Sequence, residues 1–338
     1  MLRVRFSETF LGFRPYTLLP PVSVGTTRKR LSMTQSDFRL NSEALDADPT
    51  PRPINLEAGR RAFLQTLGLG MVGATLLGFD AGRNPAAAQS ITDADIFNFA
   101  LNLEYLEAEF YLRASVGQGL ADAEVRGTGT LGPVAGGRAV PFQSQIIANY
   151  ANEIARNERQ HVNTLRAALG SNAVARPAID LGFAFTIAAR AAGLAGPNDT
   201  FDAFANETNF LLAAFIFEDV GVTAYHGAAP LIKDPANLAG AAGILAVEAY
   251  HAGIIRTVLY SRGLYTQAQA ISDARDSLDG ASDLDQGIGN ATTSNLTPVD
   301  SSGIAFQRTP QQVLSIVYLN AGAQPNGFFP KGLNGNVK

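Results

Sequence analysis

Apolar residues recur every three or four positions in four long stretches of the chain, a spacing that predicts amphipathic helices. The first stretch follows the N-cap candidates Ser90 and Thr92 and runs to about Val116. The others cover about residues 144–169, 200–229 and 235–262. The third is apolar nearly all round between Phe210 and Phe217, so we expect it to be central. The pattern predicts an all-α fold built on a four-helix bundle.

Acidic residues and histidines interrupt the apolar faces of these four helices. The second and the fourth helix each carry a Glu-x-x-His pattern, and the first and the third each carry one inward-facing glutamate. Residues three apart share a face of a helix, so each Glu-x-x-His pair directs a carboxylate and an imidazole to one point. The inward-facing residues are Glu104, Glu158, His161, Glu218, Glu248 and His251.

Burying four carboxylates is costly unless something compensates their charge. Inward-facing basic residues are lacking in the predicted helices, so we expect metal ions to compensate. One glutamate from each of two helices and one Glu-x-x-His from each of two others can hold two iron or manganese ions. Cysteine is absent, which leaves the harder ligands that suit iron, manganese or zinc. A single Glu-x-x-His is often a solvated ion pair, but two on apolar faces favour a dinuclear site.

The metal-binding pattern is part of an internal repeat. Glu104 precedes Tyr111 by seven residues, and Glu218 precedes Tyr225 by seven. Each Glu–Tyr helix comes before a Glu-x-x-His helix. The first half of the repeat is longer than the second because it contains a glycine-rich stretch at 117–140. We interpret this stretch as an inserted loop. The segment between the halves is long enough for a crossover connection that runs the length of the bundle. Apolar residues at 183–189 predict a short helix within it.

The N-terminal 88 residues have the pattern of a targeting segment. Residues 1–59 are predicted to be a disordered leader, within which Met33 is a second candidate start. Arg60 and Arg61 precede an uncharged run at 62–79, and Ala86-Ala87-Ala88 offers a cleavage site. This order resembles a twin-arginine (Tat) signal over residues 60–88. A membrane anchor is the less favoured alternative, because the run is short and glycine-rich. We expect a periplasmic or secreted mature protein without a stable membrane span.

Residues 97–111, Phe-Asn-Phe-Ala-Leu-Asn-Leu-Glu-Tyr-Leu-Glu-Ala-Glu-Phe-Tyr, resemble the desiccation-related members of the ferritin-like superfamily. Residues 308–318 and 327–335 give a second match in the tail. The resemblance implies that the six inward-facing residues are metal ligands, with Glu158 and Glu248 as bridging carboxylates. It also implies that Tyr111 and Tyr225 orient ligands from outside the metal's coordination shell.

The other acidic residues and the third histidine of these helices are expected to lie outside the main ligand set, with Glu107 as the ambiguous case. Glu107 is either an additional ligand or a neighbour at the helix edge, beside the ligands. Glu207 is expected to cap a helix end or pair with another helix, and His226 to lie at the surface or the end of the bundle. Glu109 and Glu153 are expected to be solvated.

Composition limits the remaining functions. The chain has 338 residues, 46% of them hydrophobic and 17% charged, and a formal net charge of -4. This composition suits a folded core and gives no reason to expect nucleic-acid binding. Hydrolase motifs such as Gly-x-Ser-x-Gly are missing.

We expect the bundle to cover residues 89–265. The extension at 266–338, with one helix at about 310–320, is expected to pack on the bundle.

The sequence predicts a class of chemistry rather than one reaction. Two metal ions bridged by carboxylates can support two-electron reactions with O2, peroxide or Fe(II), and the resemblance places such chemistry in protection against desiccation or oxidative stress. The alternative is a non-enzymatic protective scaffold with a structural or vestigial metal site. A homo-oligomer is compatible with the sequence, whereas the 117–140 loop and the tail would obstruct a ferritin-type cage.

Overall fold

The structure of the protein is a computed structural model, and it describes residues 91–338. The leader predicted at 1–59, the second candidate start and the Tat signal predicted at 60–88 lie outside the described residues.

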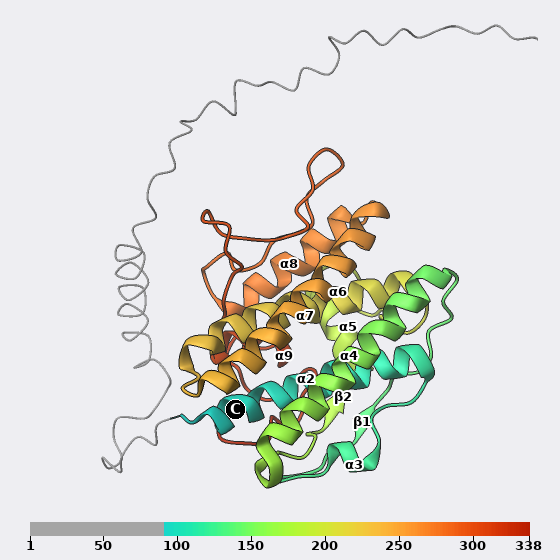
Figure 1. Cartoon of the computed structure of the whole chain (residues 1–338). Helices are drawn as coiled ribbons and strands as arrows, with labels where there is room; N and C mark the ends of the chain where they lie inside the picture. Colours follow the sequence, from blue (N-terminus) through green and yellow to red (C-terminus); the bar gives the residue numbers. More distant parts are fainter. Residues whose placement is uncertain (1–90) are drawn as a thin grey trace, which may run out of the picture. The chain divides into compact units, whose positions relative to one another are not determined.

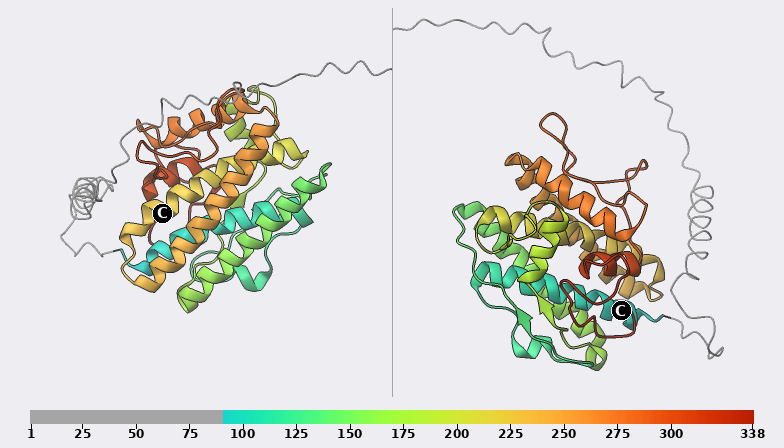
Figure 2. Two further views of the ribbon diagram at one scale, coloured as in Figure 1. Left: turned by 45° about the horizontal axis from the view of Figure 1, so that its top comes forward. Right: turned by 180° about the vertical axis from the view of Figure 1, so that it is seen from behind.

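Four long helices form the centre of the described fold. They are α2 (Asp93–Val116), α4 (Gln145–Leu169), α6 (Glu207–Ala228) and α7 (Pro235–Ser261). The closest helix pairs are α2 with α4 and α6 with α7, and the two pairs run side by side in Figures 1 and 2. The all-α, ferritin-like bundle predicted from the apolar spacing is confirmed.

The helix starts follow local capping chemistry. Thr92 and Asp95 form a capping box at the start of α2, and Ser144 caps α4. The third helix begins near 207 rather than near 200, because the Asn206 side chain accepts a hydrogen bond from the backbone N–H of Asn209 and starts the helix there. The preceding residues 200–206 therefore form an irregular segment.

The inserted segment at 117–140 follows a defined path along the crossover. It contains α3 (Asp122–Val125) and β1 (Val134–Ala135), and β1 pairs in parallel with β2 (Ile179–Asp180). A Cβ atom on Gly127 would lie 2.2 Å from the carbonyl oxygen of Ala173. The glycines of this stretch thus allow close backbone contact with the crossover. The short helix predicted at 183–189 is α5 (Phe183–Ala191), after the turn η3 (Gly170–Asn172).

The tail contains two helices, α8 (Tyr265–Asp279) and α9 (Pro310–Val317). Both pack against α6 and against each other, and the right view of Figure 2 shows them on one side of the bundle. The prediction of a single helix in the tail was therefore wrong. The sequence pattern concealed α8 because its buried face carries polar residues, Arg275 among them.

A buried ion-pair network joins the tail to the bundle. The expectation that inward-facing basic residues are lacking was wrong: three arginines are almost completely buried. Arg308 Nε lies 2.7 Å from Asp279 and its Nη2 lies 3.0 Å from Asp285, while Arg256 lies 2.7 Å from Asp219. The network consists of Arg256, Arg275, Arg308, Asp219, Asp279 and Asp285. These arginines are paired with aspartates, so they do not compensate the glutamates of the bundle interior.

Among residues 91–338, α7 is long and apolar enough to cross a membrane by length and composition alone. A core helix of a water-exposed bundle passes the same test. Because α7 packs along α6 and turns Glu248 and His251 into the interior, we assign it to the bundle.

Candidate metal centre

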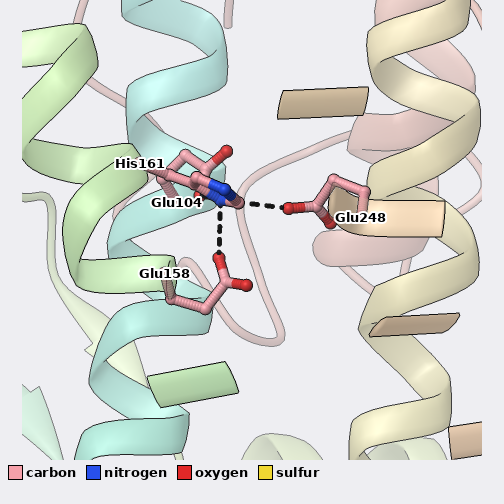
Figure 3. A group of neighbouring side chains, drawn as sticks. All are labelled: Glu104, Glu158, His161 and Glu248. Carbon is pink, nitrogen blue, oxygen red and sulfur yellow. Dashed lines mark ion pairs between the residues drawn. The ribbon is translucent and has the colours of Figure 1, made fainter. Parts of the chain in front are cut away.

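The six inward-facing residues predicted as ligands meet in the middle of the bundle. Each of the four long helices supplies at least one of them, and all six are buried. Their potential ligand atoms fall into two groups, each spanning at most 4.8 Å. The first group contains Glu104, Glu158, His161 and Glu248, and Figure 3 shows these side chains converging from α2, α4 and α7. The second contains Glu158, Glu218 and His251.

Both histidines turn Nδ1 toward the carboxylates. His161 Nδ1 lies 3.3 Å from an oxygen of Glu104 and 3.3 Å from an oxygen of Glu248. His251 Nδ1 lies 2.8 Å from Glu158 Oε1 and 3.6 Å from Glu218 Oε2. Glu158 uses its other oxygen toward His161, at 3.4 Å. Glu158 thus belongs to both groups, as a bridging carboxylate would.

The donor set fits a pair of metal ions. Each of the six residues has a buried ligand atom without a hydrogen-bond partner, and for Glu158 and Glu248 both oxygens are free. Unpartnered buried polar atoms are rare in folded proteins because each is costly. Here the free atoms point at one another, which suits oxygen and nitrogen coordination of iron or manganese. With neutral imidazoles, four carboxylates would balance the charge of two divalent ions.

Burial and mutual repulsion disturb the titration of the carboxylates. Burial raises the pKa of Glu104 to about 7. Burial also raises the pKa of Glu218, and it raises that of Glu248 well above its ordinary value, with the charge of Glu158 adding to the effect. Glu158 differs: burial opposes its ionisation, but the two neighbouring histidines lower its pKa to about 2. The site therefore contains an ionised carboxylate surrounded by others that resist ionisation until a cation binds.

The histidines titrate in the opposite direction. Burial opposes protonation of His251, but the carboxylates of Glu218 and Glu158 raise its pKa to about 11. The pKa of His161 is raised above its ordinary value in the same way, chiefly by Glu104. In the metal-free site the imidazoles therefore act as cations. A metal must displace their Nδ1 protons, so metal uptake and proton release are coupled.

Two tyrosines hold ligands across the bundle. Tyr225 on α6 donates a hydrogen bond of 2.5 Å to Glu104 on α2. Tyr111 on α2 donates a short hydrogen bond to Glu218 on α6. Burial raises the pKa of both phenols well above the ordinary value, so both remain donors. Each tyrosine supports the glutamate of the other half of the repeat, which fits the predicted orienting role.

Glu107 is buried beside the cluster but does not belong to either group of potential ligands. Burial raises its pKa well above the ordinary value, and the charge of Glu248 adds to the effect. A Cβ atom on Gly221 would lie 2.2 Å from Glu248 Oε2 and 3.5 Å from Glu107 Oε1. Gly221 therefore makes room for two carboxylates. Sequence reasoning missed this role, although a glycine three residues after Glu218 within an apolar helix was a signal.

Asn157 is a second residue that sequence reasoning missed. Its Oδ1 lies 3.2 Å from Nε2 of His251, the ring nitrogen that faces away from the carboxylates. A partner at Nε2 fixes the orientation of the imidazole and favours a proton on that nitrogen, leaving Nδ1 free for a metal. The signal in the sequence was weak, because Asn157 is only the residue before Glu158 on α4.

Three further glutamates lie away from the metal centre, and two of them have the surroundings that the sequence predicted. Glu207 accepts hydrogen bonds from the backbone N–H groups of residues 143 and 144 and pairs with Arg262 at 2.6 Å, as predicted for a cap and interhelix partner. Glu153 is exposed as predicted. Glu109 is fully buried, so its prediction as solvated was wrong; Arg113 and Arg176 pair with it and make its burial tolerable.

His226 lies away from the cluster, near the end of α6. It is half-buried, and its Nδ1 lies 3.2 Å from the backbone oxygen of Phe306 in the tail. The prediction that it is a bundle-end histidine agrees with this position, but the tail partly covers it.

A four-helix bundle with two Glu-x-x-His pairs and two further glutamates at its centre defines a ferritin-like protein. The model of the family described as ferritin-like domain matches residues 92–261, and the chain belongs to this family. It is 32% identical to the desiccation-related protein PCC13-62 of Craterostigma plantagineum over 267 residues, which cover 72% of this chain and 83% of the relative.

A second relative carries a different name. The ferritin-like catalase Nec2 of Nesocodon mauritianus is 30% identical over 268 residues, covering 72% of this chain and 84% of that protein. No solved structure matches the chain at a significant level. The family, the relatives and the buried carboxylate and histidine cluster together fit a stress-related ferritin-like metal protein.

Proposed function

We propose that this protein binds two iron or manganese ions between its four long helices and disproportionates hydrogen peroxide as part of protection against desiccation and oxidative stress. The observation that carries the proposal is the convergence of unpartnered buried ligand atoms on two adjacent points, with Glu158 common to both. Within the described residues these atoms have no hydrogen-bond partner, and their contacts are ion pairs between the two histidines and the carboxylates, which metal coordination would replace.

Peroxide is favoured over O2 and Fe(II) as the substrate by one relative, which is named a ferritin-like catalase. The balanced reaction converts two hydrogen peroxide molecules into one O2 and two waters. One peroxide is oxidised by two electrons and the other is reduced by two, so the protons released by the first are consumed by the second. When bound by the six ligand residues, a pair of iron or manganese ions would supply the two-electron exchange.

The chain's own groups perform the remaining tasks. Tyr111 and Tyr225 fix the orientations of Glu218 and Glu104, so that the carboxylates need little rearrangement when substrate arrives. The packed apolar helices exclude bulk water from the cluster, which strengthens the electrostatic interactions within it. Asn157 holds His251 in the orientation that presents Nδ1.

Elemental analysis of the natively purified protein, combined with peroxide decay measured by an oxygen electrode, tests the proposal. We expect about two metal ions per chain and evolution of O2 from peroxide, both lost after chelation. A folded protein with less than about one metal ion per chain would contradict the dinuclear site. A metal-loaded protein that leaves peroxide, O2 and Fe(II) unchanged would instead favour the protective scaffold.

We also propose that the mature protein acts in the periplasm or outside the cell after export by the Tat machinery. The support is the order of Arg60-Arg61, an uncharged run and small residues in the sequence. Fractionation of cells that produce Arg60→Lys/Arg61→Lys protein tests this: the double variant should remain in the cytoplasm. Unchanged export would contradict the Tat route.

Light scattering of the purified protein should give a monomer or a small homo-oligomer rather than a cage.

A further inference from the structure

An apolar cavity adjoins the metal centre between α2, α6 and the tail. We call it the inner cavity; its walls include Leu106 and Glu107 of α2, Val220 and Gly221 of α6, and Val317 and Phe328 of the tail. Gly221 forms part of its wall and also faces the carboxylate of Glu248, which belongs to the candidate metal centre. Gly221 therefore lies both in the wall of the inner cavity and beside a carboxylate of the metal centre.

The size and lining of the inner cavity restrict what it can hold. The space open to the centre of a water-sized molecule is about 20 Å³, against about 10–15 Å³ needed for one water. A small molecule fits, and an organic substrate does not. Among the described residues that line it, Glu107 has the only polar side chain. A water or a hydrated metal ion needs two to four polar partners, so the cavity favours a small apolar molecule.

A second cavity lies beside the inner one. This outer cavity lies between α5, α6, α8 and α9, has about 30 Å³ of comparable space, and shares Ile216 and Ile316 with the inner cavity. Its lining is apolar except for Arg275, and Ala191 at its rim is exposed. The side chains of Ile216 and Ile316 lie between the two cavities, and a change of their rotamers would open a path for a diatomic molecule.

The α4 side of the metal centre carries polar groups with some exposure. Asn157 on α4 is half-exposed and contacts His251, and His161 on the same helix retains slight exposure. A polar molecule such as hydrogen peroxide can exchange hydrogen bonds along this side, whereas the inner cavity offers it only Glu107. The centre thus has one polar approach and one apolar approach.

We propose that the inner cavity is a dioxygen site, through which O2 leaves or reaches the metal centre by way of the outer cavity. The assignment rests on the proposed function for the origin of the O2, which is the product of peroxide disproportionation. The cavity walls themselves specify the ligand class, a small apolar diatomic molecule. Separate routes for peroxide and for O2 would prevent the product from obstructing the incoming substrate.

Xenon pressurisation of crystals of the full chain tests the site without relying on activity. Xenon is apolar and binds in dry apolar cavities. We expect xenon density between Val220 and Val317. The variant Val220→Leu adds one methylene group to the wall and should remove that density. Val247→Leu on the partly exposed side of α7 is the matched control and should retain it. Ordered water in the wild-type cavity, or xenon retained in Val220→Leu, would overturn the proposal.

Steady-state kinetics of the metal-loaded proteins provide the second measurement. We expect release of O2 through the cavity to limit turnover, so Val220→Leu should lower kcat for peroxide about tenfold while KM and metal content remain near the wild-type values. An unchanged kcat together with lost xenon density would show that O2 does not use the cavity. Xenon binding in a protein inert to peroxide would instead remove the proposed function and leave the cavity assignment intact. Should Val220→Leu fail to fold, Ile316→Met at the junction of the cavities replaces it, with the same expected losses.

Discussion

The phenol of Tyr225 on α6 donates a 2.5 Å hydrogen bond to Glu104 on α2. Tyr111, which follows Glu104 by seven residues on α2, donates a hydrogen bond to Glu218 on α6. The two halves of the internal repeat therefore support each other at the metal centre. Each half supplies the tyrosine that donates a hydrogen bond to the glutamate of the other half. Neither half can form a complete site alone.

Tyr111→Phe and Tyr225→Phe should have similar effects because the two contacts are equivalent. Loss of a hydrogen bond that orients a ligand typically lowers metal affinity or activity about 10- to 100-fold. Competition with a fluorescent chelator measures the affinity. The exposed Tyr250 provides the control, and Tyr250→Phe should leave affinity unchanged. A strong effect from only one of the two buried tyrosines would contradict the equivalence.

Glu158→Gln should remove most bound metal, because Glu158 is common to both groups of ligand atoms. Glu153→Gln provides a matched control on the same helix, since Glu153 is exposed and lies outside the cluster. Elemental analysis of both variants after identical purification measures the difference. Full metal content in Glu158→Gln would show that the centre is built on other residues.

Gly221→Ala should separate stability from metal binding. Alanine is better than glycine within a helix by about 1 kcal/mol, but the added Cβ atom would lie 2.2 Å from Glu248 Oε2 and displace that carboxylate. We expect metal-free protein at least as stable as the wild type and a loss of metal affinity of about tenfold or more. Thermal unfolding and metal titration give the two quantities.

The control for Gly221→Ala is Gly243→Ala on α7. A Cβ atom there meets no other atom within 4 Å, so the same gain in helix propensity should occur without loss of metal. Equal metal affinities in the two variants would mean that Glu248 adjusts to the added methyl group at no cost.

The metal-free protein should be more stable near pH 5 than near pH 8. The pKa of Glu104 is raised to about 7 by burial, so its contribution to stability is present below its unfolded pKa near 4.5 and is lost as pH rises to 7. The pKa of His251 is raised to about 11, so its contribution falls as pH rises above 6.5. Both groups therefore lower the stability of the metal-free protein as pH rises from 5 to 8.

Thermal unfolding of chelator-treated protein at several pH values checks this dependence. Glu158, with a pKa lowered to about 2, contributes in the opposite sense, but only as pH falls below about 4.5. Metal loading should reverse the trend between pH 5 and 8, because metals compete with protons for the same groups. Metal-free protein that becomes more stable as pH rises from 5 to 8 would contradict these pKa directions.

Arg308→Ala should destabilise the protein by about 3–5 kcal/mol, the usual cost of leaving buried charges without a partner. Arg308 holds Asp279 and Asp285 beneath the tail. Arg126→Ala is the control, because its pair with Asp122 is exposed and should contribute at most about 1 kcal/mol. Chemical denaturation measures both variants. Equal stabilities would show that the tail does not depend on the network.

The sequence by itself determined the four long helices, most of their ends, and the six residues that meet between them. These follow from local rules: apolar periodicity, capping residues such as Thr92, and the i, i+3 spacing of Glu158 and His161. The buried carboxylates also indicated that the four helices face one another, because a buried carboxylate requires partners from other elements.

Only the tertiary structure decided the features that depend on residues far apart in the chain. Glu109 is buried because Arg176 from the crossover reaches it, and α8 is stable because its polar face meets buried aspartates. The role of Gly221 depends on the approach of Glu248 from another helix. Periodicity records whether a position is apolar, but a polar group is buried when a distant partner compensates its charge, and that partner is fixed only when the chain has folded.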